Sequence, residues 1–477
     1  MPGKDGRQGA RRAGDRMSKR WKLVAGTALS LATLMGSASA FAETIEDALV
    51  AAYSGNPDLQ AARAKLRAVD EGVSQARAGW LPTISLNASY GYTSTRAVSP
   101  FTSFGIISPK TQVHPTQGDL TLVQPLFTSG RTYYSIRQAK ADVRAGRADL
   151  RLAEEQVLLN AVTAFMNVIR DQSVLELNHN NVEVLKRQLQ ATRDRFQVGE
   201  LTRTDVAQAE ARLANAASSL TAAEASLTAS RSNYQTVVGQ APGSLTGPTG
   251  LPPLPGAEMD ALEIGLQENP SLVGARERET ASRFAVAVAK GALGPTVELQ
   301  AQLAHGEDMQ IRGDQTDSKS IVAQIRIPLY QGGAEWSRVR EAKQVNSQSL
   351  AAIASTERQV VEGVANAWEG LRSARAERDS GQEQVRANRV AFEGVQQEAK
   401  VGSRTTLDVL NAEQELLNAQ VSLVGAERNE VVAAYQLISS IGRLTAEQLA
   451  LPVQVYDPTA YYRKVNFKLI GWDTKTH

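Results

Sequence analysis

Two aspartates at matching points of the chain are the residues that most clearly invite a chemical question. Asp205 lies in the stretch QVGELTRTDVAQAEA (197–211), and Asp408 lies 203 positions later in KVGSRTTLDVLNAEQ (400–414). Each follows a glycine by six residues and a threonine by three. Threonine followed by an acidic residue at this spacing is typical of a capped helix N-terminus. An exposed carboxylate can also attract a cation or an arginine, so a structural and a functional role are both open.

The glycines of the two stretches indicate what kind of structure holds the aspartates. Gly199 and Gly402 fall where one long helix-like segment ends and another begins. A chain reversal at such a point favours a residue that can adopt positive φ, which glycine does without steric cost. We therefore expect two helix–turn–helix tips, with Thr202 and Thr405 capping the returning helices. The pattern by itself favours capping as the role of both aspartates.

The rest of the sequence offers little catalytic chemistry. The chain has no cysteine, which excludes disulfides, thiolate chemistry and a lipidated N-terminal cysteine. Its four histidines are scattered, at His114, His179, His305 and His477, so a metal site is disfavoured. We find no pairing of a nucleophile with a base and no phosphate-binding loop. The sequence therefore predicts neither an enzyme nor a cofactor.

The N-terminal residues 1–42 have the pattern of an export signal. A basic stretch ends in SKRWK (18–22), an apolar run follows at 23–36, and SASAFA (37–42) offers small residues for cleavage. The apolar run is too short for a membrane-spanning helix, so we predict a signal peptide. This segment carries eight Lys or Arg and two Asp, a net charge of +6; since the whole chain is +2, the remainder is 2 − 6 = −4. A nucleic-acid partner therefore has no support from charge.

The remainder of the chain repeats itself. EDALVAAYSGNPDLQAAR (46–63) resembles DALEIGLQENPSLVGAR (260–276), and QPLFTSGR (124–131) resembles IPLYQGGA (327–334). The offset is 213 at the Asn-Pro pairs but 203 from the second landmark onward, so the first copy carries ten extra residues between them. We predict a first repeat at 43–241, a Pro/Gly-rich linker at 242–256, a second repeat at 257–450 and a C-terminal tail at 451–477.

Between these landmarks the apolar pattern changes from helical to alternating. Such alternation predicts strands at about 83–92, 118–126, 296–304 and 320–329, with polar connections at 93–116 and 306–319. Each strand is near the ~9–11 residues that a tilted transmembrane strand needs. Four strands alone cannot close a barrel in lipid, because open edges are not tolerated there. Either the strands lie outside a membrane, or several chains pool them.

The longest segments are helical. No proline interrupts 131–198 or 334–401, and small or apolar residues recur at spacings of three and four. A continuous helix of this length would extend roughly 100 Å at ~1.5 Å per residue. Such a long helix without internal caps implies coiled-coil-like packing. Shorter return helices are expected at about 203–238 and 405–441. The fold class is therefore mainly α with a β part, built from a duplicated unit.

This order of duplicated motifs resembles the TolC-type outer-membrane channels, which serve efflux pumps and type I secretion systems. The resemblance rests on the two Asn-Pro landmarks, the strand–loop–strand blocks, the PLF and PLY motifs and the two tips, and it covers roughly 43–450. It implies a homotrimer whose protomers each give four strands to one 12-stranded barrel in the outer membrane of a Gram-negative bacterium. It also implies a long periplasmic α-helical barrel that ends at the tips. The partners implied are outer-membrane lipid, a periplasmic adaptor protein and an inner-membrane ABC or proton-driven transporter.

The resemblance also gives the tip residues expected roles. Asp408 matches an aspartate that narrows the periplasmic entrance, Asn411 stands where relatives have a second acid, and Arg404 matches an arginine that ties this tip to the first one. The residues expected at this periplasmic gate are Thr204, Asp205, Arg404, Asp408 and Asn411. The residues expected to contact the adaptor are Val198, Gly199, Glu200, Leu201 and Thr202 in the first tip, and Val401, Gly402, Ser403, Arg404 and Thr405 in the second.

Two other classes of protein compete with the channel. A periplasmic coiled-coil adaptor or scaffold would explain the long helices but not four alternating strands at matched repeat positions. A plain porin would need many strands and little helix. The sequence therefore favours a passive exit duct, and it does not identify the cargo as drug, metal, glycan or protein.

Overall fold

The computed structural model describes residues 43–96, 110–248 and 250–474. The predicted signal peptide at 1–42 lies outside these described residues, as does part of the predicted connection at 93–116. Among the helices of the described part, none combines the length and the apolar character needed to cross a bilayer.

Two copies of one unit follow each other along the chain. The elements of the first copy are α1 (Ile45–Gly55), α2 (Pro57–Ala78), β1 (Thr83–Tyr90), β4 (Thr116–Phe127), α3 (Arg131–Gln197) and α4 (Arg203–Val238). Those of the second are α5 (Glu258–Glu268), α6 (Pro270–Gly291), β5 (Thr296–Glu307), β6 (Gln315–Arg326), α7 (Ala334–Lys400) and α8 (Thr406–Ser440). A short ribbon of β2 (Thr93–Arg96) and β3 (Lys110–Val113) belongs to the first copy, and α9 (Ala460–Val465) lies in the tail. The fold is therefore mainly α with a β part, as the sequence predicts.

The Asn-Pro pairs fix where α2 and α6 begin. Asn56 accepts hydrogen bonds from the backbone N–H groups of Asp58 and Leu59, while Pro57 occupies the first helical position. Asn269 caps α6 in the same way, through the N–H of Ser271. Both asparagines also donate from Nδ2 to the end of a return helix, Asn56 to the Val237 carbonyl and Asn269 to that of Ser440, at 2.9 Å each. The repeated pair therefore sets two helix starts and joins each to the end of its own repeat.

The four long strands form one antiparallel sheet in the order β1-β4-β5-β6, so the two copies pair through β4 and β5. Directly paired residues share a face of the sheet. One row across the four strands is Ile84, Leu122, Ala301 and Ile321, and the next row on that face is Leu86, Leu120, Leu303 and Lys319. The rows between them, on the opposite face, are Ser85, Thr121, Gln302 and Ser320, and then Asn87, Asp119, Ala304 and Ser318. The sheet thus has one apolar and one polar face.

The polar connections are shorter than the sequence predicts. β5 and β6 stay paired as far as Glu307 with Gln315, whereas the sequence predicts a connection over 306–319. β2 and β3 form a paired ribbon within the stretch expected to be a connection at 93–116. Conversely, β1 ends at Tyr90 and β6 at Arg326, before the expected limits at 92 and 329. Alternation of apolar residues marks only the part of a strand with one apolar face, while the backbone ladder continues through polar residues such as Asp317.

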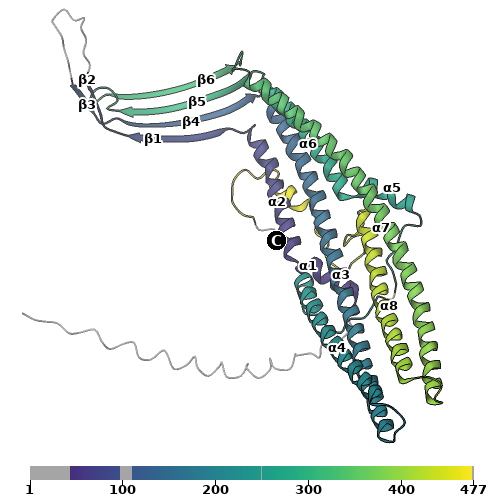
Figure 1. The fold of residues 1–477 in the computed structure, drawn as a ribbon. Helices are drawn as coiled ribbons and strands as arrows, with labels where there is room; N and C mark the ends of the chain where they lie inside the picture. The colour runs from purple at the N-terminus through teal and green to yellow at the C-terminus, as the bar shows by residue number, and fades with distance from the viewer. Residues whose placement is uncertain (1–42, 97–109, 249, 475–477) are drawn as a thin grey trace, which may run out of the picture.

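The helices lie side by side in a curved layer that leaves the sheet at an angle (Figure 1). Over the half nearer the tips the order is α4, α3, α8, α7, and nearer the sheet α2 and α6 take part instead. The main core lies in the middle of this layer, where Phe165 of α3 and Tyr234 of α4 are fully buried with ring centres 6.5 Å apart. Small residues such as Ala161 and Ala164 let the helices approach closely there.

Candidate functional site: two helical tips

The two chain reversals lie at the end of the helical layer farthest from the sheet (Figure 1). Gly199 and Gly402 adopt φ values of +81° and +79°. In both tips the glycine N–H donates to a carbonyl three residues back, Phe196 at 3.0 Å and Ala399 at 3.2 Å. The duplicated glycines therefore make the same left-handed reversal twice, as the sequence predicts.

Each returning helix begins with a reciprocal capping box. In the first tip, Asp205 Oδ2 accepts from the N–H and the hydroxyl of Thr202 at 2.9 and 2.7 Å, and Asp205 N–H donates to Thr202 Oγ1 at 3.3 Å. In the second tip, the corresponding distances between Thr405 and Asp408 are 3.0, 2.8 and 3.2 Å. The capping role that the sequence favours is therefore present at both aspartates.

The same contacts keep both aspartates charged. Hydrogen bonds from the Thr202 side chain and backbone hold the pKa of Asp205 below its usual value. Hydrogen bonds from the Thr405 backbone and side chain do the same for the pKa of Asp408, with a smaller contribution from the positive charge of Arg404. Because both pKa values are lowered, both carboxylates are negatively charged at neutral pH.

The two tips carry ion pairs of opposite polarity. In the first, Arg195 at the end of α3 donates to Glu200 in the turn at 3.0 Å. In the second, Glu398 holds the helical position equivalent to Arg195, and it accepts from Arg404 of the turn at 2.8 Å. All four side chains are about half exposed. Duplication has thus kept the geometry of the turn while reversing which charge lies at the helix end and which lies in the turn.

The predicted contact between Arg404 and the first tip is absent from this single chain. Arg404 is bonded to Glu398 in its own tip, while the carboxylate of Asp205 is bonded to Thr202. The structure instead joins the repeats through Arg212 of α4, which donates to Asn411 Oδ1 of α8 at 2.7 Å. Arg212 was missed in the sequence. The repeat offset of 203 aligns Asn411 with Gln208, and Arg212 lies one helical turn beyond Gln208, which is the signal that could have identified it.

Glu413 is a second residue near the tips that the sequence did not single out. It is partly buried on α8, and burial raises its pKa from 4.5 to about 7, while the positive charge of Arg187 acts in the opposite direction. Its counterpart in the first repeat is Glu210, which is paired with Arg193 at 2.6 Å. The position matching Arg193 in the second repeat is Gln396, so the cation of that pair has no equivalent there.

The remaining predicted tip residues are exposed or nearly so. Leu201 is partly buried, and the others of the two turns lie at the surface. Val198 and Val401 are 71% and 80% exposed, so each turn presents one apolar side chain to solvent. Thr204, predicted at the gate, is exposed on the first turn of α4.

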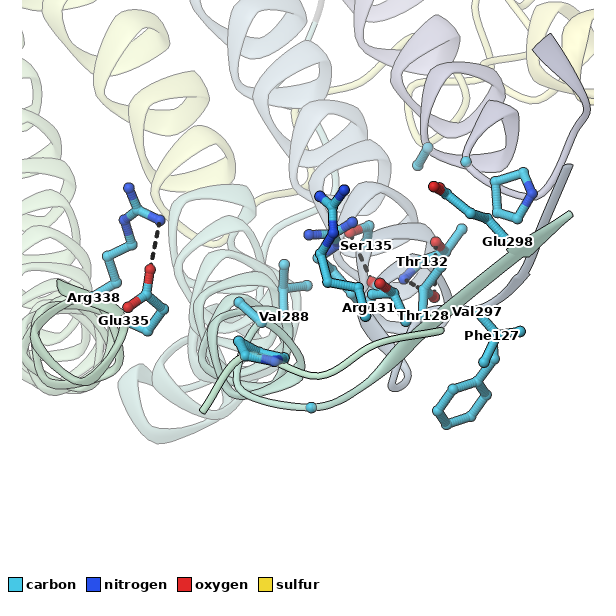
Figure 2. A pocket seen from close by; sticks show the side chains of 18 of the residues that line it. Phe127, Thr128, Arg131, Thr132, Ser135, Val288, Val297, Glu298, Glu335 and Arg338 are labelled. Carbon is cyan, nitrogen blue, oxygen red and sulfur yellow. Dashed lines mark hydrogen bonds and ion pairs between the residues drawn. The ribbon is translucent and has the colours of Figure 1, made fainter. Parts of the chain in front are cut away.

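A separate cavity of 680 Å³ lies where the sheet meets the helices (Figure 2). Its charged lining includes Arg131, Glu298, Glu335 and Arg338, and Arg338 lies 3.9 Å from Glu335. The nearby hydroxyl of Thr128, just before α3, donates to the hydroxyl of Thr132 in its first turn at 3.1 Å. The contacts of Thr128 with Thr132 and of Arg338 with Glu335 are thus local ones at the start of α3 and α7. In the described ranges no three His, Asp or Glu residues are grouped to hold a metal ion.

Known proteins share this organisation. The family model for outer membrane efflux proteins matches residues 48–240 and 262–443. The outer membrane efflux protein BepC of Brucella suis is 34% identical over 458 residues, covering 95% of this chain and 97% of that protein. The outer membrane protein TolC of Escherichia coli is 25% identical over 428 residues, covering 86% and 84%.

The fold also matches a solved structure. The outer membrane channel CmeC of Campylobacter jejuni superimposes with a TM-score of 0.74 at 17% identity, over 89% of each chain. The family match covers both repeats, including the strands of each and both tips. This chain therefore belongs to the outer membrane efflux protein family.

Proposed function

We propose that this chain is one protomer of a homotrimeric exit duct, which is passive itself and is opened at its tips by partner proteins. The cargo would pass from an inner-membrane transporter through the helical part and out through a barrel in the outer membrane. The family membership supports the outer-membrane location and the role in export. The trimer, the passive character and the gating are the proposed steps.

The observation that carries the proposal is the two-faced sheet with open edges. Its apolar face includes Ile84 and Ile321, which are 67% and 76% exposed in the single chain. Within the described sheet, β1 and β6 each have a strand on one side only. Lipid would satisfy the apolar face, but unpaired backbone groups are not tolerated in hydrocarbon. Pairing β6 of one copy with β1 of the next removes both edges, and three copies of four strands give the 12-stranded barrel of the TolC-type channels.

The helices support the same assembly. α4 and α7 lie at opposite borders of the helical layer near the tips. α7 exposes Leu350 at 53% and Val390 at 63%. In a closed ring, α7 of one copy would pack against α4 of the next and cover such side chains. The helical layer and the sheet would then close about one axis.

The tips would form the periplasmic gate. Three copies would bring three Asp205 and three Asp408 carboxylates around the entrance, and all would be charged at neutral pH because their pKa values are lowered. Arg404, bonded to Glu398 in the single chain, would contact Asp205 or Thr204 of a neighbouring copy. The opposite polarity of the two tip ion pairs supports such a contact, because each tip presents a charge that complements the other.

The exposed turns would also receive the adaptor. Val198 and Val401 give each turn one exposed apolar side chain beside its charged groups. The residues proposed for this contact are Val198, Gly199, Glu200, Leu201, Thr202, Val401, Gly402, Ser403, Arg404 and Thr405. A transporter of the ABC or proton-driven class would supply the energy.

The assembly can be tested by extraction and mass. Exported protein should require detergent for release from the outer-membrane fraction, and its particle mass after subtraction of detergent should equal three protomers. A periplasmic adaptor or scaffold, the alternative for a chain with such long helices, would be released by osmotic shock without detergent. Release of a soluble monomer would contradict the proposal.

A further inference from the structure

The C-terminal tail is held along α2 by specific contacts. Tyr461 and Val465 of α9 are buried, and the Tyr461 hydroxyl donates to Glu71 of α2 at 2.6 Å. The Ser74 hydroxyl donates to the Val465 carbonyl at 2.8 Å. One turn further along α2, the guanidinium of Arg77 donates to the Asn466 carbonyl at 2.5 Å. These contacts fix the chain as far as residue 466.

Beyond this point four large apolar side chains project into solvent. Phe467, Leu469, Ile470 and Trp472 are 79%, 71%, 92% and 97% exposed. A run of this kind is unfavourable in water, because apolar surface of this size is normally buried against a partner. The contacts on α2 hold the run in place instead of folding it back onto the core.

The run lies at the level where the helices give way to the sheet. The Arg77 guanidinium sits 4.4 Å from the centre of the Phe467 ring. α2 ends one residue later at Ala78, and β1 begins at Thr83. Between them, Trp80 and Leu81 are also partly exposed, at 38% and 37%. In Figure 1 the yellow tail runs beside α2 on the side from which the strands extend. The exposed run thus begins beside the end of α2, shortly before the chain enters β1.

The charges of the tail favour an anionic surface. Residues 457–474 contain Arg463, Lys464 and Lys468 against Asp457 and Asp473, which gives 3 − 2 = +1, and Arg463 is paired with Asp457 at 2.5 Å. The segment after α9 is irregular, with few backbone hydrogen bonds, so it suits the polar interface of a bilayer and not its hydrocarbon centre. Aromatic residues with lysine and arginine beside them are typical of that interface.

We propose that residues 467–472 form an anchor that inserts into the periplasmic leaflet of the outer membrane, with the neighbouring basic side chains on anionic phospholipid headgroups. The inference goes beyond the exit-duct function, because the anchor lies outside the strands and the tips. Its effect would be to fix the depth and tilt of α2 where it joins β1. A neighbouring copy of the chain is the alternative partner for residues 467–472, but the net positive charge beside this apolar run favours phospholipid.

The test uses the absence of cysteine in the full chain. Single variants Ile470→Cys, Ile84→Cys and Met259→Cys are labelled with an environment-sensitive fluorophore and reconstituted in vesicles of phosphatidylethanolamine and phosphatidylglycerol that contain a nitroxide-bearing lipid. Ile84 is the positive control on the apolar sheet face. Met259 is the matched negative control, since it is 72% exposed on α5. α5 packs against Val360 and Val364, which lie ~40 Å along α7 from the sheet.

The anchor predicts that the nitroxide lipid quenches the labels at 470 and 84 by roughly twofold or more and leaves the label at 259 nearly unchanged. Replacing phosphatidylglycerol by phosphatidylcholine should weaken quenching at 470 and not at 84. If the label at position 84 is quenched while the label at position 470 is not, the anchor proposal is wrong and the barrel assignment stands. Protection of the 470 label from aqueous iodide without lipid quenching would assign the run to a neighbouring copy. If neither label is quenched, the anchor and the barrel assignment both fail.

Discussion

At the scale of single residues, each tip aspartate combines two properties that substitution can separate. Asp205 and Asp408 cap helices through Oδ2, and each also carries a charge. A threonine variant removes the cap and keeps the charge. An asparagine variant at the aspartate removes the charge and keeps a side chain that can cap. The gate proposal depends on the charge and not on the cap.

The cap makes a local prediction. Thr202→Ala removes the hydroxyl that bonds Asp205, so the first turn of α4 should lose about 1 kcal/mol of stability and its amides should exchange about fivefold faster. Hydrogen exchange measured by mass spectrometry on the purified protein checks this. Thr228→Ala, at an exposed position in the middle of α4, is the control and should leave the first turn unchanged. Equal exchange in Thr202→Ala and the wild type would show that the cap is not stabilising.

The bond between Arg212 and Asn411 makes a prediction about selectivity. Asn411→Asp places a carboxylate within 2.7 Å of the guanidinium, so most of the new charge should be neutralised and cation preference should change little. Asn411→Asp combined with Arg212→Gln should leave the new carboxylates unpaired and raise cation preference clearly. Reversal potentials in a potassium chloride gradient measure this. Equal cation selectivity in the single and double variants would show that Asn411 does not line the entrance.

At the scale of elements, α8 contains a group whose charge depends on pH. Burial raises the pKa of Glu413 from 4.5 to about 7, so the folded state binds a proton more tightly than the unfolded chain does. Its stabilising contribution is therefore complete below pH 4.5 and is lost as the pH rises through 7. After allowance for partial exposure, the change is about 1–2 kcal/mol.

Glu413→Gln should abolish this pH dependence. Hydrogen exchange of α8, corrected for the chemical effect of pH, should be faster in the wild type than in the variant at pH 8, and similar in both at pH 5. Glu210→Gln is the matched control, because Glu210 is the duplicated counterpart and is paired with Arg193. If α8 exchanges at the same rate in the wild type and in Glu413→Gln at both pH values, the pH dependence does not come from Glu413.

The same elements show what the sequence could and could not predict. Gly199, Thr202 and Asp205 determine their turn through local chemistry, so their geometry was predictable, and duplication doubled the signal. The polar ends of β5 and β6 were missed because backbone pairing continues where apolar alternation stops. The bond from Arg212 to Asn411 was missed because it joins two repeats and depends on how α4 and α8 are set against each other. Local turns can be predicted from a single sequence, whereas predicting contacts between helices that are distant in the chain requires knowing how those helices pack.

At the scale of the whole molecule, the single chain has open borders in both of its layers. β1 and β6 lack a second neighbour in the described sheet, and α4 and α7 border the helical layer. The apolar sheet face and the exposed tail at 467–472 lie toward one end, and the charged tips lie at the other. This polarity supports an assembly anchored in the outer membrane at one end and controlled by partners at the other.

The central claim is that this assembly is a duct held closed at its tips, and single-channel conductance in planar bilayers tests it most directly. Arg404→Ala and Asp205→Ala should each raise the conductance several-fold over the wild type, because each removes one charge of the proposed contact between neighbouring tips. Thr202→Ala, which loses the cap but keeps both charges, should conduct like the wild type. Wild-type conductance in both charge variants would contradict the account.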